Sequence, residues 1–579
     1  MKTDCGIIIL AAGNASRYGE AKQLLSYQGI SLVKNTIIQA IKAEIGPVIV
    51  VLGAYAEKVK EEIHDLPVQC VINLNWEKGM GSSIKVGLNS LPKVSACIVS
   101  VADQPYIHFG VFRSLYSSFP RYKMAASSYQ GNMGVPCLFG EEYFTALNGI
   151  PDSSGAKSIL ETGLVKTIPF DAGKKDIDTK EDFESLFGDF LSVSEAAALI
   201  FQHLETGEKA TMQLSDAYSY VLSRDVCAPQ DFPPFVQSSM DGYAIKFQEG
   251  KTTFRLKGEM KAGTGVDVEI NGEEACRIFT GAPLPLGADT VVMQEKVIRE
   301  GEDVQLFDAN IQEGQHVRKK GSEVCKGELA LAKGTNLSPA ALAYLSGMGI
   351  REIEVFTPPK VSLILTGDEL VRGGQLQKGQ VYEANAVALE QALRSEGVKE
   401  VDVKYCPDDK HILKRTLESC LQQSDWVILV GGVSVGEYDW VIPAAREIGV
   451  KTIFHKVRQK PGKPLFFGKR DKSLMVGLPG NPSSALTCFY IYLRPALRLL
   501  LNKPDTEYYR GAELQCDYIK PKGLTHFVKA VYRDGWVWPL GAQESYRLHS
   551  YKEANALVVL PEESEGARKG EEVQIYILP

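Results

Sequence analysis

Two stretches of the sequence alternate between strand-like and helix-like segments, and this alternation limits the possible folds more than any other feature. Short apolar runs separated by amphipathic stretches occur in residues 1–188 and again in residues 358–502. A strand followed by a helix and another strand forms a parallel sheet with helices on its faces. We therefore predict an α/β multidomain protein with a doubly wound N-terminal sheet. The predicted strands of this sheet are Gly6–Leu10, Pro47–Leu52, Val68–Ile72, Ala96–Val101 and Lys123–Ser127.

The rest of the sequence has a different character. Residues 189–357 are rich in glycine, proline and short β-type pieces, which is typical of β-rich or mixed subdomains with many turns. A helix is expected near their start, where Ser194 precedes the apolar run EAAALIFQHL. Residues 503–579 contain alternating β-type runs and suggest a small β-barrel. The predicted domains are 1–188, 189–357, 358–502 and 503–579.

Composition excludes several classes of protein. The chain has 579 residues, 44% of them hydrophobic, and a net charge of -7, which argues against disorder and against a general nucleic-acid binder. No apolar run reaches the roughly 18 residues of a transmembrane helix, and the start MKTDCGIIIL lacks the features of a signal peptide. The eleven cysteines are scattered, as expected of buried thiols in a reducing compartment. We expect a cytoplasmic protein with neither membrane nor nucleic-acid partners.

A small-residue loop follows the first predicted strand, in IIILAAGNASRYGEAKQLL. Gly13 and Gly19 allow the backbone to approach a ligand closely, and backbone N–H groups in such a loop can bind phosphates. Arg17 and Lys22 bring positive charge to the same loop, as a triphosphate needs. The simpler alternative is an ordinary strand–helix turn with solvated basic residues. The absence of the GxxxxGK[ST] pattern argues against a P-loop.

The whole string LAAGNASRYGEAKQLL resembles the signature of the MobA-like nucleotidyltransferases, and NWEKGMGSSIKVGL, VSVADQPYI and DIDTKEDF match later parts of that family. The resemblance implies a nucleotide loop, a loop for the base and the pterin, and an acidic residue, Asp103, that binds Mg²⁺ and acts in catalysis. Asp176 and Asp178 are candidates for a second metal contact, and Asp178 fits better. For Asp103 and Asp178 the alternative is a helix N-cap or turn aspartate. The implied nucleotide and pterin contacts are Leu10, Ala11, Ala12, Gly13, Gly19, Gly79, Ser82 and Ser83, with Arg17 and Lys22 as catalytic cations.

LAAG together with GMGSS resembles the molybdenum cofactor cytidylyltransferase branch, whereas the guanylyl-transferring branch usually shows LAGG. We therefore expect CTP as the nucleotide substrate. Use of GTP, or of another small acceptor, is the alternative.

Polar and glycine-rich strings in the second α/β stretch stand where strands are predicted to end. LTGDEL places Gly367 and Asp368 after one strand, and LVGGVSVGEYDWV places Gly431, Gly432, Ser434, Gly436 and Asp439 after another. QKPGKP presents Lys460 and Lys463 around a turn, a compact pair of cations suited to an anion. LPGNPSS, with Pro479, Gly480, Asn481 and Pro482, leads into a predicted helix start that favours phosphate. Taken singly, the lysines are more simply solvated surface residues and the prolines turn residues.

From about Ser192 to its end, the sequence resembles the molybdopterin molybdenumtransferases in long, ordered strings that include SSMDGYA, RIFTGAP, VYEANA and GLPGNPSS. The resemblance implies four subdomains, a homodimer, and insertion of molybdate into adenylylated molybdopterin with release of AMP. Asp241, Thr280, Asp439, Lys460 and Lys463 are the implied catalytic residues, and Glu323, Asp368 and Asp439 the implied Mg²⁺ ligands. Two positions depart from the family. Glu383 in VYEANA stands where the family more often has Asp-Thr-Asn, and Glu323 in KKGSEV stands where the family usually has Gly-Glu-Asp. Arg533, Ser545 and Arg547 match a substrate-facing region more loosely.

The combined prediction is a bifunctional enzyme of molybdenum cofactor synthesis that uses CTP, molybdopterin-AMP, molybdate and Mg²⁺. A recipient molybdoenzyme or its chaperone would be a further partner. A non-catalytic scaffold is the remote alternative, since one member of the molybdenumtransferase family has gained an anchoring role in animals. The presence of Asp103, Asp241, Asp439, Lys460 and Lys463 argues against it.

Overall fold

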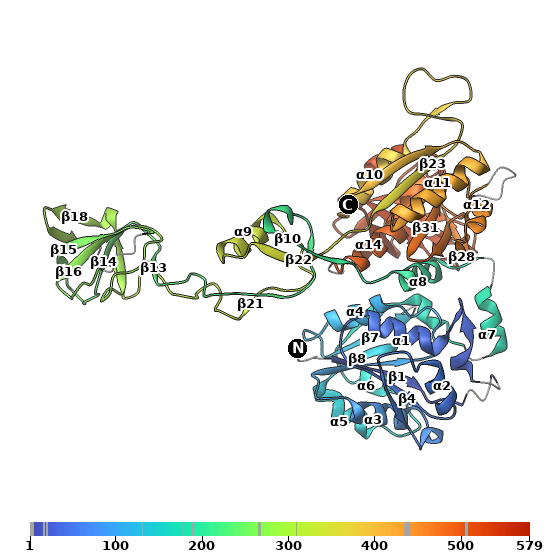
Figure 1. The fold of residues 1–579 in the computed structure, drawn as a ribbon, viewed down its shortest axis with the longest axis horizontal. Coiled ribbons are helices and arrows are strands. Elements are labelled where there is room, and N and C mark those ends of the chain that lie inside the picture. The colour runs from blue at the N-terminus through green and yellow to red at the C-terminus, as the bar shows by residue number, and fades with distance from the viewer. Residues whose placement is uncertain are drawn as a thin grey trace. The chain divides into compact units, whose positions relative to one another are not determined.

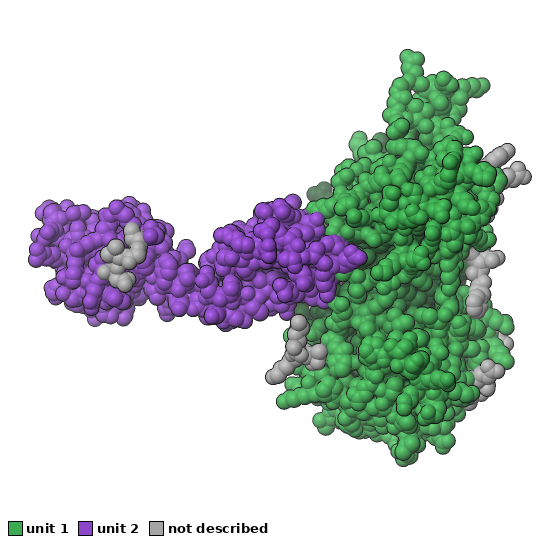
Figure 2. All heavy atoms as spheres, in the orientation of Figure 1, with its two compact units in different colours: residues 1–207, 358–579 green, residues 208–357 purple. Residues whose placement is uncertain are grey.

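The computed structural model describes residues 5–14, 18, 21–129, 131–177, 179–187, 190–263, 268–308, 310–433, 440–503 and 508–579. The chain forms two compact units, which Figure 2 shows in different colours. Unit 1 joins residues 1–207 to residues 358–579, and unit 2 consists of residues 208–357. Among the described residues, no helix has both the length and the apolarity needed to cross a membrane.

The N-terminal part of unit 1 is built on a seven-stranded sheet with the strand order β5-β4-β1-β6-β8-β7-β9 (Figure 1). Most neighbours are parallel, but β8 is antiparallel to both β6 and β7. The strands are β1 Cys5–Ala11, β4 Val48–Leu52, β5 Gln69–Ile72, β6 Ala96–Val101, β7 Met124–Tyr129, β8 Asn132–Gly140 and β9 Val165–Pro169. The helices are α1 Leu32–Lys42, α2 Ala56–Glu62, α3 Met80–Ser90, α4 Phe109–Ser117, α5 Phe144–Gly149, α6 Lys157–Leu160 and α7 Lys180–Glu184.

Strand β1 is an interior strand of this sheet, third in its order, and all seven of its residues are buried. It pairs in parallel with β4 and β6, so both of its edges and both of its faces are covered. The sequence of such a strand is a continuous apolar run and does not alternate between apolar and polar residues. The five predicted strands are confirmed, and the α/β fold class with them.

Helix α8 (Val193–His203) follows the last helix of the N-terminal part. Its N-cap is Ser192: the Ser192 hydroxyl accepts from the Glu195 N–H at 3.3 Å, and the Glu195 carboxylate accepts from the Ser192 N–H at 2.8 Å. The predicted helix is confirmed, but it begins two residues before the expected start at Ser194, because the capping box needs the acid three positions after the cap.

The second α/β part of unit 1 has a six-stranded sheet in the order β26-β23-β27-β31-β30-β28. Strands β23, β27 and β31 are parallel neighbours, so their carboxyl ends meet at one edge. The strands are β23 Val361–Thr366, β26 Val401–Cys406, β27 Trp426–Val430, β28 Lys451–His455, β30 Phe466–Arg470 and β31 Ser473–Leu478. The helices are α10 Asn385–Ser395, α11 Lys410–Gln423, α12 Val441–Glu447, α13 Pro482–Cys488, the π-helical turn η8 Phe489–Leu493 and α14 Arg494–Leu500.

The last part of unit 1 is a closed five-stranded barrel, as predicted. Strands β34, β35, β32, β38 and β36 follow one another in the sheet, and an additional pairing of β34 with β36 closes the ring. They span β32 Tyr509–Leu514, β34 Thr525–Arg533, β35 Trp536–Pro539, β36 Ala556–Leu560 and β38 Glu572–Ile577. Strand β29 (Gln459–Lys460) joins β34 in parallel, which links the barrel to the preceding α/β part.

Unit 2 is mainly β-structure, as predicted for this region. A six-stranded sheet in the order β17-β14-β16-β15-β19-β18 holds one core, and a three-stranded sheet β10-β22-β11 with helix α9 (Pro339–Gly347) holds another. The strands of the larger sheet are β14 Gly242–Ile245, β15 Thr253–Met260, β16 Glu274–Ile278, β17 Thr290–Met293, β18 Val297–Glu300 and β19 Asp303–Leu306. The smaller sheet has β10 Lys209–Gln213, β11 Val221–Leu222 and β22 Glu352–Phe356. All eleven cysteines of the chain are free thiols, and seven of them are buried.

Candidate active sites

A short ion pair stands at the carboxyl edge of the N-terminal sheet. The Lys22 ammonium lies 2.7 Å from the Asp103 carboxylate, and the two side chains are 18% and 22% exposed. Lys22 begins the short helix η1 (Lys22–Leu24) after the small-residue loop, and Asp103 comes two residues after β6. The predicted cation and the predicted metal-binding carboxylate are therefore brought together, although they are far apart in the sequence.

The loop after β1 has a buried base and an open tip. Leu10, Ala11 and Ala12 are buried, so their side chains belong to the core and only their backbone is available to a ligand. Gly13 is exposed, and a Cβ built on it would meet nothing within 4 Å. The Gly13 carbonyl accepts from the Gln23 amide at 3.3 Å, which ties the loop to η1. Arg17 and Gly19 lie outside the described residues.

Ser82 and Ser83, predicted to contact the substrate, point inward at the start of α3. Both are buried, and their hydroxyls accept from the Asn73 amide at 2.8 and 3.0 Å. Ser82 also donates to the Gly79 carbonyl at 2.8 Å. Gly79 has φ 120°, and a Cβ there would lie 2.8 Å from the Asp152 carbonyl oxygen, so only glycine fits. These residues fix the loop before α3, and Asn73, which the motif search missed, is their common partner.

The segment containing Asp176 runs back to Asp103. The Ile177 N–H donates to the Asp103 carbonyl at 3.3 Å, which places Ile177 beside Asp103. Next to Asp103, Gln104 is 3% exposed, and its amide donates to Tyr129 Oη at 2.9 Å and to the Gly173 carbonyl at 2.8 Å. Gln104 therefore holds this edge of the sheet together. Asp178 is outside the described residues.

The second candidate site lies at the carboxyl ends of β23, β27 and β31. Gly431 has φ 93°, and a Cβ there would lie 2.8 Å from Thr366 Oγ1. Gly432 has φ 61°, and its Cβ would lie 2.9 Å from Val441. A Cβ on Gly480 would meet only the Gly431 Cα, at 3.6 Å. The loops that carry Gly431, Gly432 and Gly480 thus lie close together at the sheet edge, and Gly367 (φ 141°) follows β23.

Two acidic residues of this site are held by backbone N–H groups. The Asp368 carboxylate accepts from the Asp408 N–H at 3.2 Å, and the Glu383 carboxylate accepts from the Ala386 N–H at 2.8 Å. Glu383 thereby provides an acceptor for a backbone N–H in the first turn of α10, which has no partner within the helix, and its longer side chain can reach this N–H. Ser434, Gly436 and Asp439 lie outside the described residues.

Lys460 and Lys463 flank the Pro461–Gly462 turn and are both exposed. The Lys463 ammonium lies 4.8 Å from the centre of the Phe190 ring. Lys460 pairs in register with His526 of β34, and burial together with the Lys460 charge lowers the pKa of His526 to about 4. Because the His526 imidazole is neutral at pH 7, the positive charge at this turn comes from Lys460 and Lys463.

The barrel reaches the start of α13 through two hydrogen bonds. Asn481 donates to Ser545 Oγ at 2.9 Å, and the buried Lys529 ammonium donates to Ser483 Oγ at 3.2 Å. Lys529 also donates to the Arg547 carbonyl at 3.1 Å, so it fixes the loop that carries Ser545 and Arg547. In the sequence, the lysine within the apolar run FVKAVY is the signal that could have identified Lys529. Pro479 and Pro482 flank Gly480 and Asn481 here, and α13 begins at Pro482 as predicted, whereas Arg533 points to solvent beside Asp534.

Asp241, Thr280 and Glu323 belong to unit 2. The Asp241 carboxylate accepts from the Thr280 N–H at 2.7 Å and from the Thr280 hydroxyl at 2.8 Å. These hydrogen bonds hold the pKa of Asp241 below its ordinary value. Glu323 is exposed, and its N–H donates to the Phe232 carbonyl at 3.0 Å. Among the residues that the structure describes, no three His, Cys, Asp or Glu side chains form a group that could hold a metal ion.

Known protein families match the chain in four consecutive segments. Four family profiles match in sequence: the MobA-like NTP transferase domain at residues 7–167, the MoeA N-terminal region (domain I and II) at 191–349, the probable molybdopterin binding domain at 362–499, and the MoeA C-terminal region (domain IV) at 511–578. A molybdopterin molybdenumtransferase of Haemophilus influenzae is 32% identical over 374 residues, which are 63% of this chain and 92% of that protein. The chain belongs to the molybdopterin molybdenumtransferase family.

Two further matches agree. Molybdopterin molybdenumtransferase 2 of Mycobacterium tuberculosis is 32% identical over 405 residues, 67% of this chain and 99% of that protein. The crystal structure of the molybdopterin biosynthesis MoeA protein from Pyrococcus horikoshii has a TM-score of 0.56 and 30% identity, and covers 67% of this chain and 100% of that one. This molybdenumtransferase therefore carries a MobA-like domain in addition to the parts it shares with these relatives, which confirms the predicted fusion.

Proposed function

We propose that the chain performs two consecutive steps of molybdenum cofactor synthesis. The molybdenumtransferase part inserts molybdate into adenylylated molybdopterin and releases AMP. The MobA-like domain then transfers CMP from CTP to the molybdenum cofactor and releases pyrophosphate. The observation that carries the second activity is the Lys22–Asp103 pair at the carboxyl edge of the N-terminal sheet, where open α/β sheets bind their ligands.

In the nucleotidyl transfer, the terminal phosphate of the cofactor attacks the α-phosphate of CTP. A phosphorus–oxygen bond forms to the cofactor, and the bond to the pyrophosphate leaving group breaks. Asp103 would hold Mg²⁺, which neutralises phosphate charge when it is bound. Lys22 and Arg17 would pair with the phosphates, and the open Gly13 backbone would let them approach. Asn73, through Ser82 and Ser83, would keep the base-binding loop in shape.

In the molybdenum step, Lys460 and Lys463 would attract molybdate, because both are exposed cations on one turn. The glycine loops at Gly367, Gly431 and Gly480, with Pro479, Asn481 and Pro482, would bind the pterin phosphate. Asp368 and Asp439 would hold the Mg²⁺ that offsets the adenylate diphosphate charge, and Glu323 of unit 2 is a separate candidate Mg²⁺ ligand. Asp241 and Thr280 would act as one hydrogen-bonded pair, since each fixes the other.

Pyrophosphate release tests the nucleotide specificity. The purified chain is incubated with molybdenum cofactor, Mg²⁺ and either CTP or GTP, and we expect CTP to give the faster release. Asp103→Ala should lower this rate by about 1000-fold, as loss of a metal-binding carboxylate at a phosphoryl site does. Asp65→Ala, which breaks the exposed Lys34–Asp65 pair of 2.9 Å, is the matched control. Faster release from GTP would refute the cytidylyl assignment, and full activity in Asp103→Ala would refute the metal assignment.

A further inference from the structure

Helix α8 lies between the MobA-like domain and the molybdopterin-binding part within unit 1. It contacts α4 and the short helix η4 (Asp171–Lys174) on one side, and α14 and the π-helical turn η8 on the other (Figure 1). The family profile that covers α8 begins at residue 191, so the helix belongs in sequence to the molybdenumtransferase part. The MobA-like domain therefore covers one side of a helix that comes from its fusion partner.

Near the N-terminal end of α8, a buried carboxylate pairs with one cation from each domain. Glu195 Oε1 lies 3.1 Å from the Lys175 ammonium of the MobA-like domain, and Glu195 Oε2 lies 3.8 Å from the Arg458 guanidinium of the molybdopterin-binding part. The Glu195 side chain is only 10% exposed. Burial alone would raise the pKa of Glu195, but the Ser192 N–H and Lys175 outweigh it and hold the pKa below the ordinary value.

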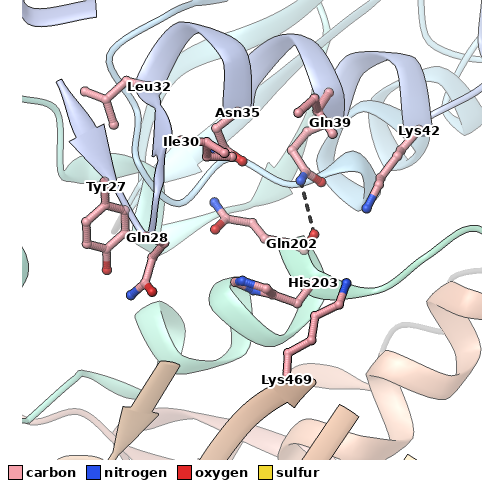
Figure 3. Close-up of a pocket in the computed structure, with 11 residues that line it drawn as sticks. Tyr27, Gln28, Ile30, Leu32, Asn35, Gln39, Lys42, Gln202, His203 and Lys469 are labelled. Carbon is pink, nitrogen blue, oxygen red and sulfur yellow. Dashed lines mark hydrogen bonds between the residues drawn. The ribbon is translucent and has the colours of Figure 1, made fainter. Parts of the chain in front are cut away.

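Just beyond the other end of α8, a second carboxylate, which is 53% exposed, also pairs with one cation from each domain. Glu205 lies 3.3 Å from the Lys42 ammonium of α1 and 2.9 Å from the Lys469 ammonium of β30. Lys42 also donates to the Leu204 carbonyl at 3.0 Å. Lys42, His203 and Lys469 all line a cavity of about 230 Å³ (Figure 3). Burial, with the nearby lysines, lowers the pKa of His203 to about 4, so the imidazole adds no charge to this triad at neutral pH.

Between the two carboxylates, hydrogen bonds join buried polar groups across the interface. The Gln39 amide donates to the Gln202 carbonyl at 3.2 Å, the bond drawn in Figure 3. The Gln202 amide donates in return to the Pro105 carbonyl at 2.6 Å and the Ile107 carbonyl at 2.8 Å. Both glutamines are buried, so separation of the domains would leave these groups to be solvated again.

A direct contact between the two domains adds to the α8 interface. The Arg113 guanidinium on α4 donates to the Lys42 and Ala43 carbonyls at 3.1 Å and to the Leu499 carbonyl of α14 at 3.4 Å. Gly110, also on α4, lies against α14: a Cβ built there would lie 3.0 Å from both methyl carbons of Leu499 and from His108 Nδ1. A large side chain at this position would therefore require Leu499 or α14 to move.

We infer that the MobA-like domain binds the molybdenumtransferase part directly, through α8 and α14, and does not depend on the covalent link. The recurrence of one carboxylate shared by a cation from each domain, near both ends of one helix, is the observation that carries this inference. The partner of this face of the MobA-like domain is thus the α8–α14 surface of the same chain. The inference does not rest on either proposed activity.

Cleavage of the intact protein tests it. A protease site is inserted between residues 188 and 189 of the full chain, the folded protein is cut, and the products are run on a sizing column at roughly micromolar concentration. We expect the two fragments to elute together at the position of the uncut chain. Elution as two separate folded fragments, each with its helical circular dichroism, would overturn the inference.

Charge reversal identifies the surface. Glu205→Lys places three cations together, and we expect it to weaken fragment association by roughly tenfold or more, since like charges in an interface are costly. Glu161→Lys makes the same charge change at an exposed position of the MobA-like domain and should have no effect. Gly110→Leu should separate the fragments through steric exclusion alone. Equal association of Glu205→Lys, Gly110→Leu and Glu161→Lys would overturn the assignment to α8 and α14, and thermal unfolding of each uncut variant checks that it is folded.

Discussion

The lysines of the two candidate active sites lie in opposite environments, one paired and largely buried, the others exposed. In the MobA-like domain, Lys22 is already paired with Asp103, and both side chains are largely covered. In the molybdopterin-binding part, Lys460 and Lys463 are exposed and make no ion pair with the residues that the structure describes. Under the proposed function, the first site would have to exchange partners when metal and nucleotide bind, whereas the second would present its charge directly to an oxyanion. Substitutions at Lys22 and at Lys460 and Lys463 test this difference, and one at Gly431 tests the packing of the second site.

The largest effect is expected at Lys22. Lys22→Met should lower pyrophosphate release by about 100–1000-fold, because a charged donor to the phosphates is lost. It should also tighten Mn²⁺ binding without nucleotide by several-fold, since Asp103 loses its competing cation. Electron paramagnetic resonance of free Mn²⁺ measures this binding. Lys34→Met, which breaks the comparable pair with Asp65, is the control. Unchanged Mn²⁺ affinity in Lys22→Met would show that the pair does not exchange partners.

The double substitution Lys460→Ala with Lys463→Ala should act differently. We expect AMP release at limiting molybdate to fall by about 100-fold, because two exposed cations that attract the oxyanion are removed. The loss should shrink as molybdate is raised, since the chemistry after binding is intact. Lys472→Ala, at another exposed lysine of the same part, serves for comparison. A deficit that saturating molybdate does not reduce would mean that these lysines are not a binding site.

The smallest effect is expected at the glycine edge. Gly431→Ala combines a left-handed backbone with a Cβ 2.8 Å from Thr366 Oγ1, so it should reduce the free energy of unfolding by about 1–3 kcal/mol. Urea unfolding of the full chain measures this loss. Gly373→Ala, where a Cβ would meet nothing within 4 Å, should be neutral. If both variants were equally stable, the close approach of the loops after β23 and β27 would not be a constraint.

The main elements of the fold could be predicted from the sequence because apolar runs and turn residues determine local structure. The strand β1 and the start of α13 at Pro482 followed from such patterns. Long strings also located Lys22 and Asp103, but only the sheet shows that they meet. The direction of a side chain was the limit: Ser82 and Ser83 stand in a binding motif, yet their hydroxyls turn inward to Asn73. Nothing local to these serines marks Asn73 as their partner.

The cap of α8 shows a second limit. Ser192 and Ser194 are both acceptable caps by residue type, and Glu195 decides between them through its bond back to the Ser192 N–H. The same carboxylate pairs with Lys175 and Arg458, which come from different domains. Helix geometry and domain docking therefore share one side chain, and a local pattern can disclose only the first of these roles.

Because unit 1 is assembled from residues 1–207 and 358–579, its parts are not made together. Synthesis proceeds at about 5–20 residues per second, so unit 2 takes roughly 10–30 seconds to emerge before residue 358 is added. During that time Glu195 and Glu205 have Lys175 and Lys42 as partners, but Arg458 and Lys469 do not yet exist. The apolar side of α8 that will meet α14 is then open to solvent. A nascent chain of this length is the state in which chaperones would have the most to bind.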